Sequence, residues 1–380
     1  MIHSKKIIIF GAGRIGRSFI GQVFNRSGYE GVFVDINQTL IDLLNRHRQY
    51  KVVVKGADEE QTLWIQPVRG VNLYDTDKVV GELANAGIAA LSVGQQGIQA
   101  AIPVIAQALM LRQKIYGDIP LDIIIAENMR HADVFVRGEL KKNLPAGYPV
   151  ERLVGLVETS IGKMVPIMTR KDMDEDPLQI FAEPYNTLIV DRKGFLNTLP
   201  DVSFLSPKDH IKAWVDRKLF IHNLGHATVA YLGFLAHPDA NYIYEILEDK
   251  QIYRIAGQTM QQSAAILQAM YPGEFTLKEL DDHIDDLLKR FRNRNLGDTV
   301  FRVGCDLYRK LGSEDRLAAP IHAAIRLSKP YHLILDVLKA GIQFRAKDEN
   351  GNHLPTDELF FEEAQKGVRE ILKNICGIDI

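Results

Sequence analysis

Nearly continuous apolar runs alternate with amphipathic stretches over the first half of the chain. Apolar runs of strand length occur at 6–10, 31–35, 88–93 and 121–126. Stretches with helical periodicity lie between them, at 15–26, 98–111 and 131–142. Strands that are apolar throughout and are separated by helices are typical of a parallel sheet covered on both faces. Further apolar runs at 153–168 and 188–191 predict strands that close or extend this sheet.

The pattern changes after about Pro200, where long helical periods take over and strand signals almost vanish. These periods lie at 211–235, 243–270, 277–291, 306–311, 318–327, 333–344 and 356–375. The sequence therefore predicts an α/β domain, doubly wound around a mostly parallel sheet, followed by a mostly α-helical domain. We place the boundary between 195 and 205, so that the first domain covers 1–197 and the helical domain 198–380.

Composition excludes several classes of protein. The 46 basic and 48 acidic residues give a net charge of −2, and 46% of the chain is hydrophobic, which is ordinary for a globular protein and argues against disorder. The chain has no excess of basic residues, so we do not expect it to bind nucleic acid. We also expect neither a membrane span nor an export signal. The two cysteines, Cys305 and Cys376, suit a reducing compartment, so a cytoplasmic location is expected.

A glycine-rich turn follows the first predicted strand and opens the first helix. Gly11-Ala-Gly13-Arg14-Ile15-Gly16 matches the G-x-G-x-x-G pattern of dinucleotide-binding domains. The first glycine permits the tight turn, the second lets the backbone approach a pyrophosphate, and the third allows the helix to pack closely on the strand. The alternative is a glycine turn that binds no ligand.

Asp35 ends the second predicted strand and follows Gly16 at the spacing that the dinucleotide-binding pattern requires of its acidic residue. A carboxylate at this position accepts hydrogen bonds from the adenosine ribose and repels a 2′-phosphate. No arginine adjoins Asp35-Ile-Asn37, so the sequence favours NAD over NADP, with Asp35 and Asn37 in its site. Val93 and Gly94, after a later strand, are expected to border the nicotinamide half, although an ordinary strand-to-helix turn would show the same pattern.

Three polar residues with chemical potential lie on one predicted helix of the second half. In a regular α-helix, where each residue turns about 100°, the spacing of Lys218, Asn223 and His226 places all three on one broad face. Gly225 falls on the same side and removes bulk where another group could approach. Two simpler explanations stay open, because a helical lysine is usually solvated and a lone histidine is usually a satisfied core residue.

The pattern Lys218-x4-Asn223-x2-His226 resembles the signature of the polyol-specific long-chain dehydrogenases. The resemblance spans roughly 5–345, and the segments that carry it are 10–21, 35–37, 225–233, 290–304, 309–311 and 315–317. The chain length is similar to that of the branch that acts on mannitol 1-phosphate rather than free mannitol. The fold that this family implies is an NAD-binding α/β Rossmann domain, here 1–197, followed by a helical substrate-binding and catalytic domain, here 198–380. This division agrees with the periodicity of the chain.

The resemblance also implies a reaction and roles for residues. The family oxidises a secondary alcohol without zinc, and this sequence has no clustered set of metal ligands, so no metal is expected. Lys218 is implied as the general base, and His226 as a residue that orients the substrate. Asn223 and Asn128 are implied as two amide donors to the developing alkoxide. Asn128, after the fourth strand, would otherwise only cap the next helix.

The implied substrates are two small-molecule phosphates, the polyol phosphate D-mannitol 1-phosphate and the sugar phosphate D-fructose 6-phosphate. The implied cofactor is NAD, and we expect the protein to be a monomer or a small homo-oligomer. A phosphate ester needs cationic side chains to bind it, and the candidates are Arg309, Lys310 and Arg316. Each of these side chains could instead be solvated at the end of a helix. Tyr185 and Asn186 could contact the sugar. Two alternatives remain: another polyol or hexuronate (tagaturonate or fructuronate) oxidoreductase of the same family, and an NAD-binding sensor without turnover.

Overall fold

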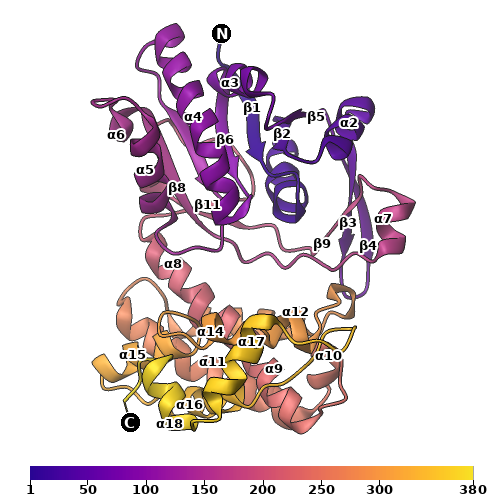
Figure 1. Ribbon diagram of the computed structural model, residues 1–380, viewed down its shortest axis with the longest axis vertical. Coiled ribbons are helices and arrows are strands. Elements are labelled where there is room, and N and C mark those ends of the chain that lie inside the picture. The colour runs from indigo at the N-terminus through magenta and orange to yellow at the C-terminus, as the bar shows by residue number, and fades with distance from the viewer. Residues whose placement is uncertain (380) are drawn as a thin grey trace. The chain divides into compact units, whose positions relative to one another are not determined.

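The computed structural model describes residues 1–379 and divides into two compact units. The first is Met1–Ile211, and the second begins at Lys212. The first unit is built around β-sheet and the second is helical (Figure 1). The predicted fold class, a Rossmann domain followed by a mostly α-helical domain, is confirmed.

The first unit contains an eight-stranded sheet in the order β11-β10-β8-β7-β6-β1-β2-β5. The strands are β1 His3–Phe10, β2 Glu30–Asp35, β5 Val68–Asn72, β6 Ala86–Leu91, β7 Leu121–Ile125, β8 Val154–Ser160, β10 Leu188–Asp191 and β11 Leu205–Lys208. The six strands from β5 to β8 are parallel, whereas β10 runs antiparallel to β8. Chain order reverses on either side of β1, and ligands bind at the carboxyl ends of strands at such a switch point.

Helices cover both faces of this sheet, because alternate side chains of its strands face opposite ways. Ile7 and Ile9 of β1 lie in a core that includes the first helix and α2. Ile8 and Phe10 lie in a second core with α3, α4 and α5. The helices are η1 Gly16–Gly21, α1 Gln22–Asn25, α2 Gln38–His47, α3 Thr76–Ala84, α4 Gly94–Tyr116, α5 Ala132–Asn143, α6 Val150–Leu153, α7 Arg170–Glu175 and η2 Arg192–Gly194.

Several strands were not expected from the sequence. A second sheet of order β4-β3-β9 combines β3 Tyr50–Lys55, β4 Glu60–Ile65 and β9 Ile180–Ala182, and the first two carry too many polar residues to form a continuous apolar run. The edge strands β5 and β11 were also missed, and β8 stops at Ser160 although its apolar run continues to 168. Asn45 of α2 protects the edge strand β5, since its amide bonds both the N–H and the C=O of Gly70, at 2.9 and 3.0 Å.

The second unit is made of short and long helices. They are α8 Ile211–Arg217, η3 Lys218–Asn223, α9 Leu224–Ala236, α10 Ile243–Ile246, α11 Lys250–Met270, α12 Leu277–Phe291, η4 Arg294–Leu296, α13 Val300–Gly304, α14 Leu307–Lys310, α15 Ala318–Arg326, α16 His332–Ile342, α17 Pro355–Ala364 and α18 Val368–Asn374. Helix α9 is mostly buried and packs against α10, α11, α13 and α16. It is the centre of this unit's core.

The continuous helical segment Ile211–Ala236 is long and apolar enough, by length and composition alone, to cross a membrane. Its most apolar 18-residue window is 61% buried inside the protein. Burial of this kind is the property of a central core helix, which is apolar because protein surrounds it.

Gly304 at the end of α13 is a point where the core leaves no room for a side chain. A Cβ there would overlap the ring of Phe344, which is buried and packs against Tyr231 and Phe234 of α9 at ring-centroid distances of 5.3 and 5.0 Å. The packing of α13 on the central helix therefore depends on this glycine.

We predict that Gly304→Ala lowers the free energy of unfolding by about 1–3 kcal/mol, the usual cost of overpacking a well-filled core. Chemical denaturation followed by circular dichroism measures it. Adding Phe344→Leu should recover part of the loss, because the smaller side chain leaves room for the new methyl group. A Gly304→Ala protein as stable as the parent would show that the contact is not tight.

Candidate active site

The glycine-rich turn has the geometry that its pattern predicts. Gly11 has a φ of +94°, a conformation that favours glycine. A Cβ on Gly16 would overlap the carbonyl oxygen of Gly11, so this glycine permits close packing of helix on strand. A Cβ on Gly13 would meet nothing within 4 Å. Gly13 therefore borders open space on the exposed side of the turn, next to Arg14 and Ile15, which begin the helix.

Two charged side chains hold the backbone of Ala12 inside this turn. Asp35 accepts the N–H of Ala12 at 2.7 Å, and Arg17 donates to the carbonyl of Ala12 at 2.7 Å. Arg17 also donates to the carbonyl of Leu178 at 2.7 Å, just before β9. The second carboxylate oxygen of Asp35 accepts the N–H of Asn37 at 2.9 Å. Asp35 thus fixes the turn and also lies where the ribose of a nucleotide is expected. The sequence did not predict that Arg17 would hold this turn.

The segment expected to border the nicotinamide is held by a residue that was also missed. The backbone N–H groups of Val93 and Gly94 donate to one carboxylate oxygen of Glu127, at 2.6 and 2.7 Å. Burial raises the pKa of Glu127, although these two hydrogen bonds oppose the shift. Asn128 follows Glu127 directly and is exposed. The candidate amide donor therefore lies beyond the carboxyl end of β7, in the loop that leads to α5, next to the residue that bonds the turn after β6.

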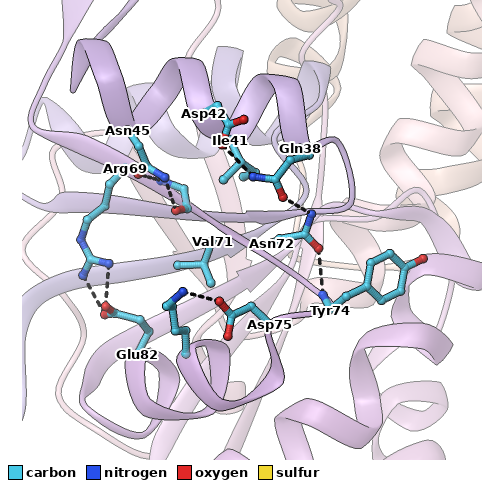
Figure 2. Close-up of a pocket in the computed structure, with 12 residues that line it drawn as sticks. Gln38, Ile41, Asp42, Asn45, Arg69, Val71, Asn72, Tyr74, Asp75 and Glu82 are labelled. Carbon is cyan, nitrogen blue, oxygen red and sulfur yellow. Dashed lines mark hydrogen bonds and ion pairs between the residues drawn. The ribbon is translucent and has the colours of Figure 1, made fainter.

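A groove of about 890 Å³ lies beside β5, between residues of α2 and α3 (Figure 2). Its polar side chains are paired with one another. Gln38 bonds Asp42 and Asn72, both at 2.7 Å. Arg69 forms a two-pronged ion pair with Glu82, at 2.6 and 2.7 Å. Because these groups already satisfy each other, the groove is better explained as the polar surface of the sheet edge than as a binding site.

The helix that carries the chemical residues is not a regular α-helix. Lys218–Asn223 forms a π-helical turn, in which the N–H of Leu224 donates to the carbonyl of Leu219, five residues earlier. The regular α-helical rotation assumed from the sequence is therefore wrong between Lys218 and Asn223, because a π turn contains more residues. Such turns occur frequently at functional sites. Gly225 allows close helix packing, since a Cβ there would lie 2.5 Å from the sulfur of Met260 in α11.

Lys218 is partly buried, and its environment disfavours the ammonium form. Burial lowers its pKa from 10.5 to about 8, and the positive charge of Arg316 adds to the effect. At pH 7 about one molecule in ten then carries the neutral amine, compared with about one in three thousand for an ordinary lysine. This shift is in the direction that a general base requires.

His226 lies on α9, just beyond the π segment, with its ring flat on Phe291. The two ring centroids are 4.5 Å apart and the planes differ by 5°. Burial holds the pKa of His226 well below its ordinary value, so the imidazole is neutral, and nearby cations add to this effect. In decreasing order of effect these cations are Arg302, Arg316, Lys310 and Arg290.

A further histidine on the π turn was missed by sequence reasoning. His222 follows Lys218 by four positions, and its ring lies 6.3 Å from that of His226 and 5.5 Å from that of Phe291. Burial holds its pKa well below the ordinary value, and the positive charge of Arg290 acts in the same direction. The only sequence signal for His222 was its spacing of four positions from Lys218.

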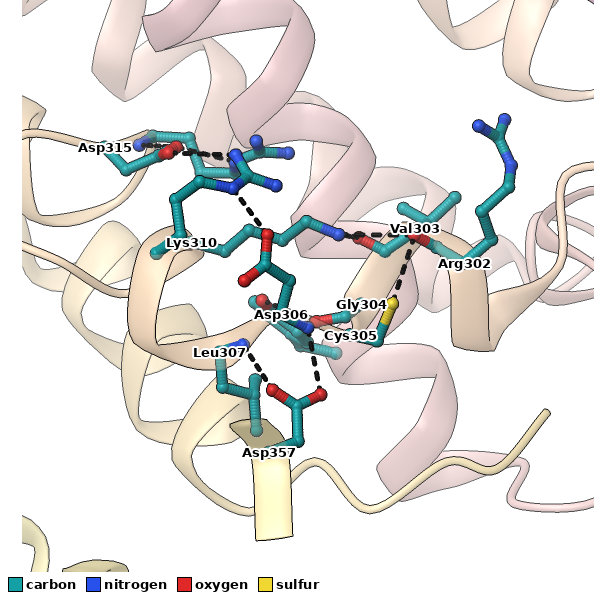
Figure 3. Close-up of polar contacts among 12 residues, drawn as sticks. Arg302, Val303, Gly304, Cys305, Asp306, Leu307, Lys310, Asp315 and Asp357 are labelled. Atoms are coloured by element: carbon teal, nitrogen blue, oxygen red, sulfur yellow. Dashed lines mark hydrogen bonds and ion pairs between the residues drawn. The ribbon is translucent and has the colours of Figure 1, made fainter. Parts of the chain in front are cut away.

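The three candidate phosphate ligands are in different situations. Lys310 is buried, and its ammonium donates to the carbonyls of Arg302 and Val303 at 3.2 and 2.7 Å, which satisfies the end of α13 (Figure 3). Burial, and then Arg316, lower the pKa of Lys310 to about 8. Arg309 is exposed and forms ion pairs with Asp306 and Asp315.

Of the three candidates, Arg316 is the one whose charge lowers the pKa of both Lys218 and His226. Its side chain is 9% exposed, and its Nε donates to Asp315 at 2.8 Å. Its charge contributes to the pKa shifts of Lys218, His226 and Lys310. Arg316 is therefore the candidate phosphate ligand whose charge affects both the lysine of the π turn and the histidine.

The two residues expected to contact the sugar lie in the first unit and share one partner. Lys163 is buried, and its ammonium donates to the carbonyl of Tyr185 at 2.8 Å and to the side-chain oxygen of Asn186 at 2.6 Å. The side-chain oxygen of Asn186 is thus already bonded. Within residues 1–379, no group of three His, Cys, Asp or Glu side chains could hold a metal ion.

Comparison with known proteins identifies the family. Residues 5–203 match the family described as "Mannitol dehydrogenase Rossmann domain", and residues 210–375 match "Mannitol dehydrogenase C-terminal domain". Two solved structures share the fold. One is Pseudomonas fluorescens mannitol 2-dehydrogenase in a ternary complex with NAD and D-mannitol, with 18% identity and a TM-score of 0.75 over 97% of this chain and 87% of that one.

The second similar structure is a D-sorbitol dehydrogenase in substrate-free form, with 16% identity and a TM-score of 0.81. The match covers 99% of this chain and 89% of that one. At these identities the structures support the fold, whereas the two family matches cover nearly the whole sequence. The expected membership in a polyol dehydrogenase family is therefore confirmed: this chain belongs to the mannitol dehydrogenase family and is a dehydrogenase that acts on CH–OH groups.

Proposed function

We propose that this protein is an NAD-dependent dehydrogenase that interconverts D-mannitol 1-phosphate and D-fructose 6-phosphate, with Lys218 as its general base. The observation that carries the phosphate assignment is the gathering of Arg290, Arg302, Lys310 and Arg316 around the neutral imidazole of His226. Three of them pair with aspartates, and four cations near one imidazole still suit a dianionic substrate group better than an uncharged polyol.

The residues of the first unit fit NAD. Gly13 leaves open space where a pyrophosphate would approach, and the first helix presents its N-terminus to that anion. Asp35 stands at the end of β2, where its charge disfavours a 2′-phosphate. Bound NAD supplies the acceptor or donor of the hydride.

The residues of the π-helical segment fit the proton chemistry. In the oxidation direction, the amine of Lys218 takes the proton of the substrate hydroxyl while the same carbon loses a hydride. Asn223 donates an amide hydrogen bond to the oxygen on which negative charge develops, and His226 orients the neighbouring hydroxyls. In the reduction direction, the ammonium of Lys218 returns the proton. Asn128 is proposed as the second amide donor.

A hexuronate is the nearest alternative substrate, because its carboxylate is also an anion that arginines bind. A panel measured by NADH absorbance separates these possibilities: fructose 6-phosphate, free fructose, tagaturonate and fructuronate in parallel, with NADPH as a second cofactor. We expect the highest kcat/KM with fructose 6-phosphate and NADH. A preference for free fructose or for a hexuronate would overturn the phosphate assignment.

The cofactor assignment predicts a contrast between two glycines of the same turn. Gly13→Ala should leave the melting temperature unchanged, because its Cβ meets nothing, but should weaken NADH binding by about tenfold or more, about 1.4 kcal/mol. Gly16→Ala should destabilise the unit by about 1–3 kcal/mol, because its Cβ would overlap the Gly11 carbonyl. Thermal denaturation and NADH fluorescence titration measure the two effects. Unchanged NADH affinity in Gly13→Ala would argue against a pyrophosphate at this turn.

The base assignment predicts a pH profile. Because the neutral amine is the active form, the rate of mannitol 1-phosphate oxidation should rise with pH through a midpoint near 8 and then level off. Arg316→Met removes a charge that disfavours the ammonium, so the pKa of Lys218 rises and the midpoint should move to higher pH. Initial rates between pH 6 and 10 test this.

Lys218→Ala serves as the control for that profile. It should bind NADH normally and lose at least ~100-fold in turnover, the usual contribution of a positioned acid or base. A midpoint that stays in place in Arg316→Met, or near-normal turnover in Lys218→Ala, would contradict the assignment.

The phosphate assignment predicts different outcomes for two arginines that bond the same aspartate, Asp315. Arg316→Ala should raise the KM for fructose 6-phosphate by about tenfold, equivalent to about 1.4 kcal/mol. Arg309→Ala is the matched control and should change that KM less than about twofold, because Arg309 is exposed and does not perturb Lys218 or His226. Steady-state kinetics with fructose 6-phosphate and free fructose decide between them. Equal effects of the two variants would remove the support for Arg316 as the phosphate ligand.

A further inference from the structure

A buried carboxylate, Asp298, faces the histidine of the candidate active site. Asp298 lies between η4 and α13, and its side chain is 5% exposed. One carboxylate oxygen accepts from the guanidinium of Arg302. The other lies 3.3 Å from Nε2 of His226. Its backbone is also fixed, because its carbonyl accepts the N–H of Ile243 in α10 at 2.9 Å.

The two facing atoms are both without a hydrogen bond in the part of the chain that the structure describes. Nε2 of His226 and Oδ2 of Asp298 are each shielded from solvent. A buried donor or acceptor without a partner is unfavourable, and these two lie within bonding distance of one another. A small change in ring or carboxylate orientation closes the bond. Hydrogen bonds in active sites are often long in the ligand-free state and tighten when substrate binds.

The surroundings restrict which bond can form. The ring of His226 stacks on Phe291, which sets its plane, and the imidazole is neutral and so carries a single N–H. Asp298 pairs with the guanidinium of Arg302, and a carboxylate in such a pair accepts hydrogen bonds and does not donate them. The proton of His226 must therefore sit on Nε2, and Nδ1 is left bare as an acceptor.

We propose that Asp298 is a positioning residue that locks His226 in its Nε2–H tautomer, so that Nδ1 accepts a hydrogen bond from a substrate hydroxyl. This inference rests on the proposed function only in naming a hydroxyl of the substrate as the donor. An acceptor at this point selects a hydroxyl and disfavours a carbonyl or carboxylate in the same place. The carboxylate that orients His226 also holds Arg302, so one residue positions a neutral and a charged group together.

The experiment reads the tautomer directly by long-range ¹H–¹⁵N NMR of protein labelled at histidine nitrogen, with the His226 signals assigned from the His226→Gln variant. The parent protein should show a protonated Nε2 and a bare Nδ1. Asp298→Asn presents an amide N–H to Nε2, so the proton should move wholly or partly to Nδ1. Asp298→Glu restores a carboxylate and should restore the Nε2–H form.

Activity provides the second measurement, and a buried carboxylate elsewhere provides the control. Asp298→Asn should lower kcat/KM by at least ~tenfold, since a wrong tautomer removes the acceptor, and Asp298→Glu should recover part of the loss. Asp357→Asn is the matched control: Asp357 is similarly buried and accepts the N–H groups of Asp306 and Leu307 at 2.9 and 2.7 Å. It should leave the His226 tautomer unchanged.

A bare Nε2 in the parent protein, or an Nε2–H form that persists in Asp298→Asn, overturns the proposal. The parent spectrum decides by itself if Asp298→Asn does not fold. Because the tautomer is measured without substrate, its outcome is separate from that of the substrate panel. Failure of fructose 6-phosphate as a substrate would overturn the proposed function and leave the tautomer result standing.

Discussion

Positive charge held inside the helical unit is the constraint on which its site depends. The segment Ile211–Ala236 is the apolar centre of that unit, yet it carries Lys218 and His226. Burial disfavours the charged form of both side chains, and Arg316 reinforces the effect. The same environment therefore favours the neutral forms of the lysine and of the imidazole, and it holds several cations near His226.

Both units fix the groups of their sites by bonding them to neighbouring charged side chains. In the first unit, Asp35 and Arg17 hold the N–H and the carbonyl of Ala12, so the glycine turn keeps its shape before a cofactor arrives. In the second, Lys310 satisfies the end of α13, and Asp298 bridges Arg302 and faces His226. Supporting bonds of this kind reduce the reorganisation that binding would otherwise require.

The sequence predicted the features that depend on local pattern and missed those that depend on tertiary contact. Apolar runs identified six strands of the main sheet, but β5, β11 and the small sheet lack such runs. Spacing placed Lys218 and His226 on one helix, whereas the π turn that precedes His226 has no signature in the periodicity. Arg17, Glu127 and Asp298 are ordinary charged residues in the sequence. Their roles follow from partners that only the folded chain brings close to them.

The ionisation of Lys218 tests the central claim most directly, because it needs neither substrate nor cofactor. Competitive labelling with a small amine-reactive reagent, followed by mass spectrometry of the Lys218 peptide across pH 6–11, gives the pKa of this one side chain. The account predicts a reactivity midpoint near 8 for Lys218, and midpoints near the ordinary value of about 10.4 for exposed lysines. A Lys218 midpoint equal to that of the exposed lysines would contradict it.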